Sequence, residues 1–245
     1  MIYYDSHFHA CDCMRLPQPQ KNIYFAGCTC AVKREEYFFD QKMILNNPQY
    51  IQSFGVHPYY LNEEDILFLE QLLFENKIAA VGEIGFDLFT QELKKTLDRQ
   101  KKIFESQLDL AIKYDKPVVI HNRKALNLIF EYKGKLKKIR SVIFHGFSFG
   151  FNEALSILNN GINAYFSFGN ILLKNSTKAF DTCLKIPLDK ILLETDAPFM
   201  TLKNGEKTLP ENIINIYKKF ALIKNIDEEE LCFLMEENFK NAFCL

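Results

Sequence analysis

The residues best suited to chemistry in this 245-residue chain are its five histidines and two of its carboxylates, and each occurs at or near the end of a short apolar run. They are His7 and His9 in IYYDSHFH, His57 in SFGVHP, Glu83 in AAVGEIGFD, His121 in VVIHNR, His145 in VIFHGF and Asp196 in ILLETDAPF. Because a parallel barrel places the carboxyl ends of all its strands on one face, these six runs would direct their polar side chains into one cavity. Imidazoles and carboxylates gathered in one cavity predict a metal-dependent active site.

The first run carries two histidines at alternate positions. Side chains alternate between the two faces of a strand, so Asp5, His7 and His9 point to the same side. His7 and His9 can therefore bind one ion, with Asp5 one layer deeper as the acceptor of a ring N–H. The last run repeats this arrangement, with Asp196 at the mouth and Glu194 one layer below. An H-x-H pair alone is a weak signal, but the complete set of runs is a strong one.

Glu83 and two later histidines extend the predicted site. Gly82 and Gly85 flank the Glu83 segment, where glycine allows another backbone or a ligand to approach closely. A carboxylate has two oxygens, so Glu83 can bridge two ions; its alternative role is a salt bridge at the barrel mouth. His121 and His145 lie on successive strands and would be neighbours. We therefore expect two divalent cations, and this ligand set favours Zn, Mn or Fe and also admits Mg.

Two further residues are predicted to contact the substrate. Arg123 follows His121 by two positions and so lies on the same face, further out, where its planar guanidinium could bind a phosphate bidentately. His57 is expected to donate a hydrogen bond to the substrate, although a third metal ligand or a helix cap are alternatives. The aromatic residues Phe8, Tyr59 and Phe147 are candidates for base stacking near the mouth.

Composition excludes several classes of protein. The formal net charge of −1 provides no general positive field for coating nucleic acid, so a polyanion must be held locally. The C-x-C pairs Cys11/Cys13 and Cys28/Cys30 suit neither a zinc finger nor a disulfide framework, and a zinc cluster with neighbouring histidines is the less favoured alternative. The odd cysteine count and the lack of a signal peptide favour the cytoplasm. No membrane segment and no obligate protein partner are indicated.

The elements that must position these residues alternate along the whole chain. Strand-like runs cover residues 2–9, 23–29, 51–57, 78–84, 117–122, 141–147, 163–168 and 191–196. Helix-like stretches cover residues 33–46, 63–76, 92–114, 124–132, 151–160, 171–185, 211–223 and 228–243. Eight such alternations in about 250 residues predict a single-domain (β/α)8 TIM barrel over residues 1–245, with the metal site at the carboxyl ends of the strands. An open doubly wound sheet is the alternative.

The chain resembles the TatD family of metal-dependent hydrolases, within the amidohydrolase-like barrels. The matching segments are DSHFHA, GVHPYY, VGEIGFD, PVVIHNR, HGFS and LLETDAPF, in family order and over nearly the whole chain. The resemblance implies a (β/α)8 barrel with two metal ions and deoxyribonuclease activity, often 3′ to 5′ exonucleolytic. Carried over by motif, one ion would be held by His7, His9 and Asp196, the other by His121 and His145, and Glu83 would bridge them.

The leading prediction is therefore hydrolysis of DNA, or of another phosphodiester, by a water that two metal ions activate. Glu83 and Asp196 are the predicted catalytic residues, and Asp196 would accept the proton of the water. An alternative is an amidohydrolase or esterase, such as a D-aminoacyl-tRNA deacylase. A third is a non-enzymatic barrel that keeps its metals only as structural or regulatory elements. The segment after ETDAPF departs from the family pattern, because it lacks the usual arginine and has Lys203 and Lys207 instead. Lysine lacks the planar fork of arginine, so the resemblance does not predict how this segment binds the substrate or which substrate it prefers.

Overall fold

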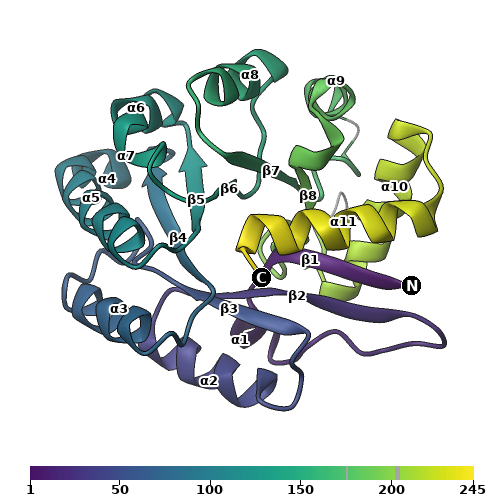
Figure 1. Ribbon diagram of the computed structural model, residues 1–245, viewed down its shortest axis with the longest axis horizontal. Helices are drawn as coiled ribbons and strands as arrows, with labels where there is room; N and C mark the ends of the chain where they lie inside the picture. Colours follow the sequence, from purple (N-terminus) through teal and green to yellow (C-terminus); the bar gives the residue numbers. More distant parts are fainter. Residues whose placement is uncertain (175, 202–204) are drawn as a thin grey trace.

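Eight parallel strands form one sheet in the order β1 to β8. The computed structural model describes residues 1–174, 176–201 and 205–245. The strands are β1 Ile2–Phe8, β2 Tyr24–Ala31, β3 Tyr50–Phe54, β4 Ala80–Asp87, β5 Val118–Arg123, β6 Val142–Phe144, β7 Ala164–Phe168 and β8 Ile191–Leu193. The segment after β8 returns to β1, because Asp196 N donates to His7 O at 2.9 Å and His9 N donates to Ala197 O at 2.8 Å. The sheet is a nearly closed (β/α)8 barrel, which confirms the predicted fold and rules out the open sheet (Figure 1).

Helices surround the strands (Figure 1). They are α1 Ala10–Cys13, α2 Arg34–Ile44, α3 Glu64–Phe74, α4 Gln91–Lys95, α5 Leu97–Lys113, α6 Leu126–Glu131, α7 Lys133–Leu136, α8 Phe151–Asn159, α9 Thr177–Lys185, α10 Ile213–Lys224 and α11 Glu228–Phe243, with 3-10 turns η1 Leu188–Lys190 and η2 Pro210–Asn212. The predicted helix over 92–114 is interrupted at Thr96, and the short α1 was not predicted. Asp227 begins α11 as expected, since its carboxylate accepts from the backbone N–H groups of Glu229 and Glu230.

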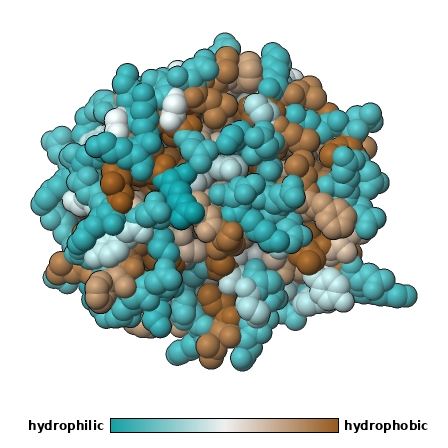
Figure 2. Space-filling model, viewed as in Figure 1, coloured by the Kyte–Doolittle hydropathy of each residue, from teal (hydrophilic) through white to brown (hydrophobic). Residues whose placement is uncertain are grey.

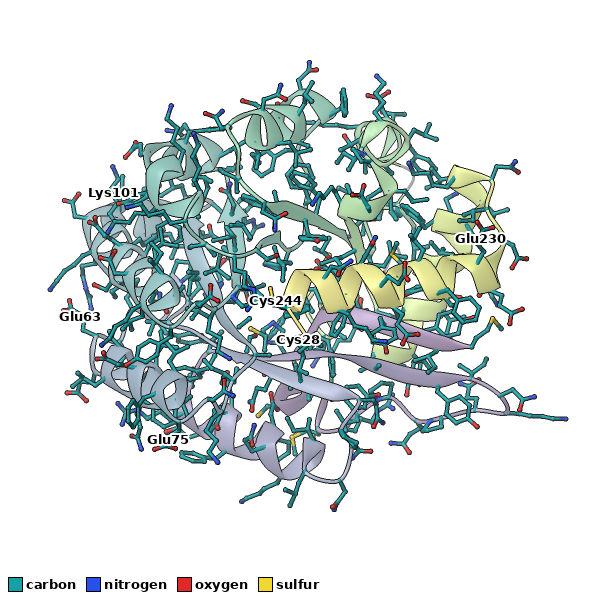
Figure 3. The ribbon with its side chains drawn as sticks, viewed as in Figure 1. Cys28, Glu63, Glu75, Lys101, Glu230 and Cys244 are labelled. Atoms are coloured by element: carbon teal, nitrogen blue, oxygen red, sulfur yellow. The ribbon has the colours of Figure 1, made fainter. Side chains whose placement is uncertain are left out.

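The last helix closes the amino-terminal end of the barrel. Figure 1 shows α11 lying across the middle of the strands. Its residues Phe239, Ala242 and Phe243 pack with Cys28 and other inward-facing strand residues in one buried cluster, and Figure 3 shows Cys28 beside the end of this helix. The carboxyl ends of the strands are thereby left as the open end of the barrel, where the predicted site residues lie.

The outer surface has the character expected when amphipathic helices pack around a buried barrel. On the face seen in Figure 2, hydrophilic side chains predominate and hydrophobic ones form separate patches. Among the described residues, no helix is both long enough and apolar enough to cross a bilayer.

Three predicted strands end three residues earlier than expected. The runs 51–57, 141–147 and 191–196 overlap β3, β6 and β8, which stop before His57, His145 and Asp196. Asp196 has a φ of 52°, in the left-handed region that no extended strand can include. Gly146, with a φ of 55°, turns the chain directly after His145. These side chains therefore belong to the loops that rise from the strands.

Candidate metal centre and substrate pocket

Glu83 lies between two groups of histidines. Its Oε2 atom is 3.5 Å from His7 Nε2 and 3.8 Å from His9 Nε2. Its Oε1 atom is 2.6 Å from both His121 Nδ1 and His145 Nε2. The two oxygens of one carboxylate thus face separate sets of imidazoles, which is the arrangement required of a bridging ligand.

The close approach of β4 and β5 depends on Gly85. Its φ of 142° is one that residues with a side chain rarely adopt, and a Cβ atom there would lie 2.0 Å from His121 O. The predicted role of glycine in this segment is therefore confirmed as backbone contact. It sets His121 beside Gly85 on the neighbouring strand, within reach of Glu83.

The first group of donors has the spacing of a metal cage. Asp196 Oδ1 lies 3.5 Å from both His7 Nε2 and His9 Nε2, as far as Glu83 Oε2 lies from His7. These separations exceed the usual 2.9 Å of an N–H···O bond. They match the ~3.4 Å expected between ligands that each lie ~2.1 Å from one tetrahedral ion.

The His7 ring also lacks any alternative partner. Its side chain is fully buried, and neither ring nitrogen has a hydrogen-bond partner among the described residues. Buried polar groups are nearly always satisfied, so an unpartnered imidazole between two carboxylates fits a bound cation. The donor set of this first group is therefore compatible with the predicted ion.

The side chains of the second group lie closer together than those of the first. His121 Nδ1 lies 3.2 Å from His145 Nε2, and both contact Glu83 Oε1. The predicted proximity of these two histidines is confirmed. His57 Nε2 is 3.4 Å from the same oxygen, and His57, Glu83 and His121 together could hold an ion.

The carboxylates of this centre remain ionised despite their burial. Burial opposes the charge of Glu83, but the imidazoles of His145, His57 and His121 outweigh it and hold the Glu83 pKa well below its usual value. Burial also raises the Asp196 pKa, but the neighbouring imidazoles of His9, His145 and His7 outweigh it, so this pKa is likewise lowered. Two buried negative charges that face imidazole nitrogens make the centre attractive to divalent cations.

Asp87 is a site residue that sequence reasoning missed. It is fully buried at the end of β4, and its carboxylate accepts from His121 Nε2 at 3.0 Å and from Phe89 N at 2.8 Å. A carboxylate on the far nitrogen of a histidine sets the tautomer and the orientation of that ring. Asp87 follows Glu83 by four residues on one strand, so the same alternation that grouped Asp5 with His7 could have identified it.

The two carboxylates predicted in deeper positions have different partners. Glu194 Oε1 accepts from Gly146 N at 2.5 Å and lies 3.6 Å from His145 Nδ1, so it supports His145. Asp5 does not bind an imidazole, and that prediction is wrong. Its oxygens accept from Thr195 N at 3.0 Å, Thr195 Oγ1 at 2.5 Å and His7 N at 3.2 Å. Asp5 thus holds the backbone of the segment after β8 and of His7.

A pocket of about 530 Å³ opens above these residues, lined in part by His9, His57, Glu83, His121, Arg123, His145, Ser148, Asp196 and Phe199. Arg123 is exposed, and its guanidinium carbon lies 3.6 Å from the centre of the Phe89 ring. This stacking holds the predicted phosphate contact at the rim. Lys207 is exposed, whereas Lys203 lies outside the described residues.

His57 is oriented as a hydrogen-bond donor. Its Nδ1 atom accepts from Tyr59 N at 3.1 Å, so in the neutral ring the proton resides on Nε2, which points into the site. Burial lowers the His57 pKa to about 4, which keeps the ring neutral at physiological pH. This tautomer favours the predicted substrate contact over the alternative of a third metal ligand.

Aromatic rings surround the pocket, but only one of them is among those predicted to stack. Tyr59 and Tyr60, each 48% exposed, and Phe199, 57% exposed, line the pocket, and Phe89, 47% exposed, packs on the lining residue Arg123. Phe8 and Phe147 are buried, so their predicted role is wrong. Phe8 points away from His7 and His9 because faces alternate along β1, and Phe147 packs on Phe166 with ring centres 4.7 Å apart.

Comparison with known proteins identifies relatives over most of the chain. A family described as TatD related DNase matches residues 4–244. An uncharacterized metal-dependent hydrolase from Haemophilus influenzae is 32% identical over 87% of this chain and 85% of its own length. Another from Mycoplasma genitalium is 32% identical over 78% of this chain and 77% of its own length. The crystal structure of the TatD homologue YjjV from Escherichia coli superposes with a TM-score of 0.85, with 24% identity over 99% of this chain and 98% of that one.

Proposed function

The chain belongs to the family of TatD-related DNases, and from that premise we propose that this metal-dependent hydrolase cleaves phosphodiester bonds in DNA with two divalent cations. One observation carries the proposal. The two oxygens of Glu83 face two separate groups of imidazoles, and Arg123 lies at the rim of the same pocket. His7, His9 and Asp196 would hold one ion and His121 and His145 the other, with Glu83 shared.

Bound divalent ions lower the pKa of water and neutralise charge on phosphoryl oxygens. Zinc and manganese suit this set of imidazoles and carboxylates, and magnesium is admissible with a phosphate substrate. Asp196 belongs to the first group of candidate metal ligands and also lines the pocket, and its carboxylate is ionised. It is therefore placed to accept the proton of the attacking water, the general-base role that we assign to it.

Two residues would orient the scissile phosphate. Arg123 offers a planar fork at the rim, held flat against Phe89. His57 offers its Nε2–H from the floor of the pocket, since its other ring nitrogen is occupied by Tyr59 N. A phosphate held by donors on two sides is fixed for in-line attack.

The test is turnover of a labelled single-stranded DNA by chelator-treated protein, re-supplied with zinc, manganese, magnesium or no ion. Hydrolysis that requires an added ion and is lost in Glu83→Ala supports the proposal. A Lys101→Ala variant, altered at a residue on α5 that pairs with Glu131 at the surface, is the matched control. Ion-independent cleavage, or none with any ion, would refute it.

One observation favours the second candidate, cleavage of an aminoacyl ester or small amide. Asp12 and Glu36 line the same pocket, where their carboxylates would attract a protonated amino group and repel further phosphates. Release of amino acid from a D-aminoacyl ester, with no cleavage of DNA by the same metal-loaded sample, would select this function.

A further inference from the structure

Cys30 lies against the candidate metal centre. Its side chain comes from β2 and is buried, and its sulfur lies within 4.8 Å of donor atoms of both His7 and Glu83. Among the residues that the structure describes, it is the one cysteine that belongs to a group of three potential ligands. Cys28, two residues earlier on the same strand, is equally buried but packs against α11 at the other end of the barrel.

The neighbours of Cys30 distinguish it from an ordinary core cysteine. A buried thiol usually packs among apolar groups, as Cys28 does. Cys30 instead lies near the carboxylate of Glu83 and the His7 ring, whose two nitrogens have no hydrogen-bond partner among the described residues. A cation between these three groups would bind the sulfur, the Glu83 carboxylate and one nitrogen of His7, since a thiolate, an imidazole and a carboxylate are all zinc ligands.

We infer that Cys30 is a thiolate ligand of the ion held by His7 and Glu83. The inference rests on the proposed metal centre and specifies the ion that the centre selects. On binding, the thiol proton leaves to solvent and the sulfur takes its place beside the nitrogen and oxygen donors. Thiolate sulfur is a soft ligand, which favours zinc, cadmium and cobalt over magnesium and manganese. A centre of oxygen and nitrogen ligands alone would discriminate less between these two sets of metal ions.

The experiment is optical titration of the full-length apoprotein with cobalt(II) under reducing conditions. A sulfur ligand gives an intense near-ultraviolet thiolate-to-cobalt charge-transfer band, whereas nitrogen and oxygen ligands give only the weaker visible bands. We expect the near-ultraviolet band in the wild type and in Cys28→Ser, the matched control. We expect it to be absent in Cys30→Ser, with the visible bands retained.

Affinity provides a second measurement that needs no catalytic turnover. Cys30→Ser should weaken cadmium binding by at least about tenfold. Even the loss of a residue that only hydrogen-bonds to a metal ligand costs about that much affinity, so the loss of a ligand should cost no less. Manganese binding should change little. Cadmium NMR of the wild type shows a sulfur donor directly by its shift, so the inference remains testable if Cys30→Ser fails to fold.

The outcomes separate this inference from the proposed function. Visible cobalt bands without the near-ultraviolet band in the wild type would overturn the role of Cys30 and leave the metal centre intact. A near-ultraviolet band that persists in Cys30→Ser would also overturn it, because another sulfur would be the ligand. Failure of the wild type to bind any divalent ion would overturn both.

Discussion

Asp40 on α2 should make the stability of this protein depend on pH in an unusual direction. Its side chain is fully buried, Oδ2 accepts from Thr29 Oγ1 at 2.7 Å, and Oδ1 has no hydrogen-bond partner among the described residues. Burial raises the Asp40 pKa from 3.8 to about 7. Thr29 Oγ1 in turn accepts from Ala10 N, directly after His9, so this carboxyl group supports the first donor group.

The sign and size of this pH dependence of stability follow from proton linkage. Between the unfolded pKa of 3.8 and the folded pKa of about 7, the unfolded chain is ionised at Asp40 while the folded chain holds the proton. Rising pH therefore favours unfolding by about 1.4 kcal/mol per unit across this window, or about 4 kcal/mol in total, and the effect levels off above it. Below the unfolded pKa the full stability is present.

The variant Asp40→Asn resembles the protonated acid and removes this dependence. Urea unfolding of both proteins, with chelator present, should give stabilities that diverge in favour of the variant by ~2 kcal/mol between about pH 5 and pH 7. Taking the difference between the proteins cancels the titration of all other groups. Parallel pH profiles, or divergence in favour of the wild type at higher pH, would refute the reasoning.

The remaining predictions concern the metal centre. Glu83→Ala should lose bound metal and nearly all hydrolysis, because one carboxylate serves both donor groups; metal analysis of the purified variant checks this, and normal metal content with normal turnover removes Glu83 from the site. Arg123→Lys should keep both ions but weaken phosphodiester turnover, since the fork is lost; a lost ion would instead indicate a structural role. Asp196→Asn keeps one ligating oxygen but not the basicity, so metal should remain at least partly bound while turnover falls by about 10²–10⁴, and unimpaired turnover would contradict the mechanism.

Alternation along strands made much of the barrel and of the site predictable. It placed His7 beside His9 and aimed six strand ends at one cavity, because the period of two is a property of each strand alone. The neighbouring positions of His121 and His145 followed from barrel order. These predictions needed no knowledge of contacts between distant segments.

Two of the details that failed depend on contacts across the barrel. The partner of Asp5 is Thr195, which lies 190 residues away and meets it only because the segment after β8 returns to β1. The burial of Phe147 against Phe166 depends likewise on how a loop turns after β6. Strand lengths at β3, β6 and β8 were overestimated because apolar sequence continues after backbone pairing has ended.

The Asp87 carboxylate links two parts of the machinery that are usually considered separately. The oxygens that orient His121 also hold the Phe89 amide, and the Phe89 ring carries Arg123. The offset between His121 and Arg123 is thus a property of the β4–β5 pair, whereas His9 and Asp196 come from the segments after β1 and β8. In the proposed mechanism, a change at Asp87 would therefore disturb one metal-binding imidazole and the predicted phosphate contact together.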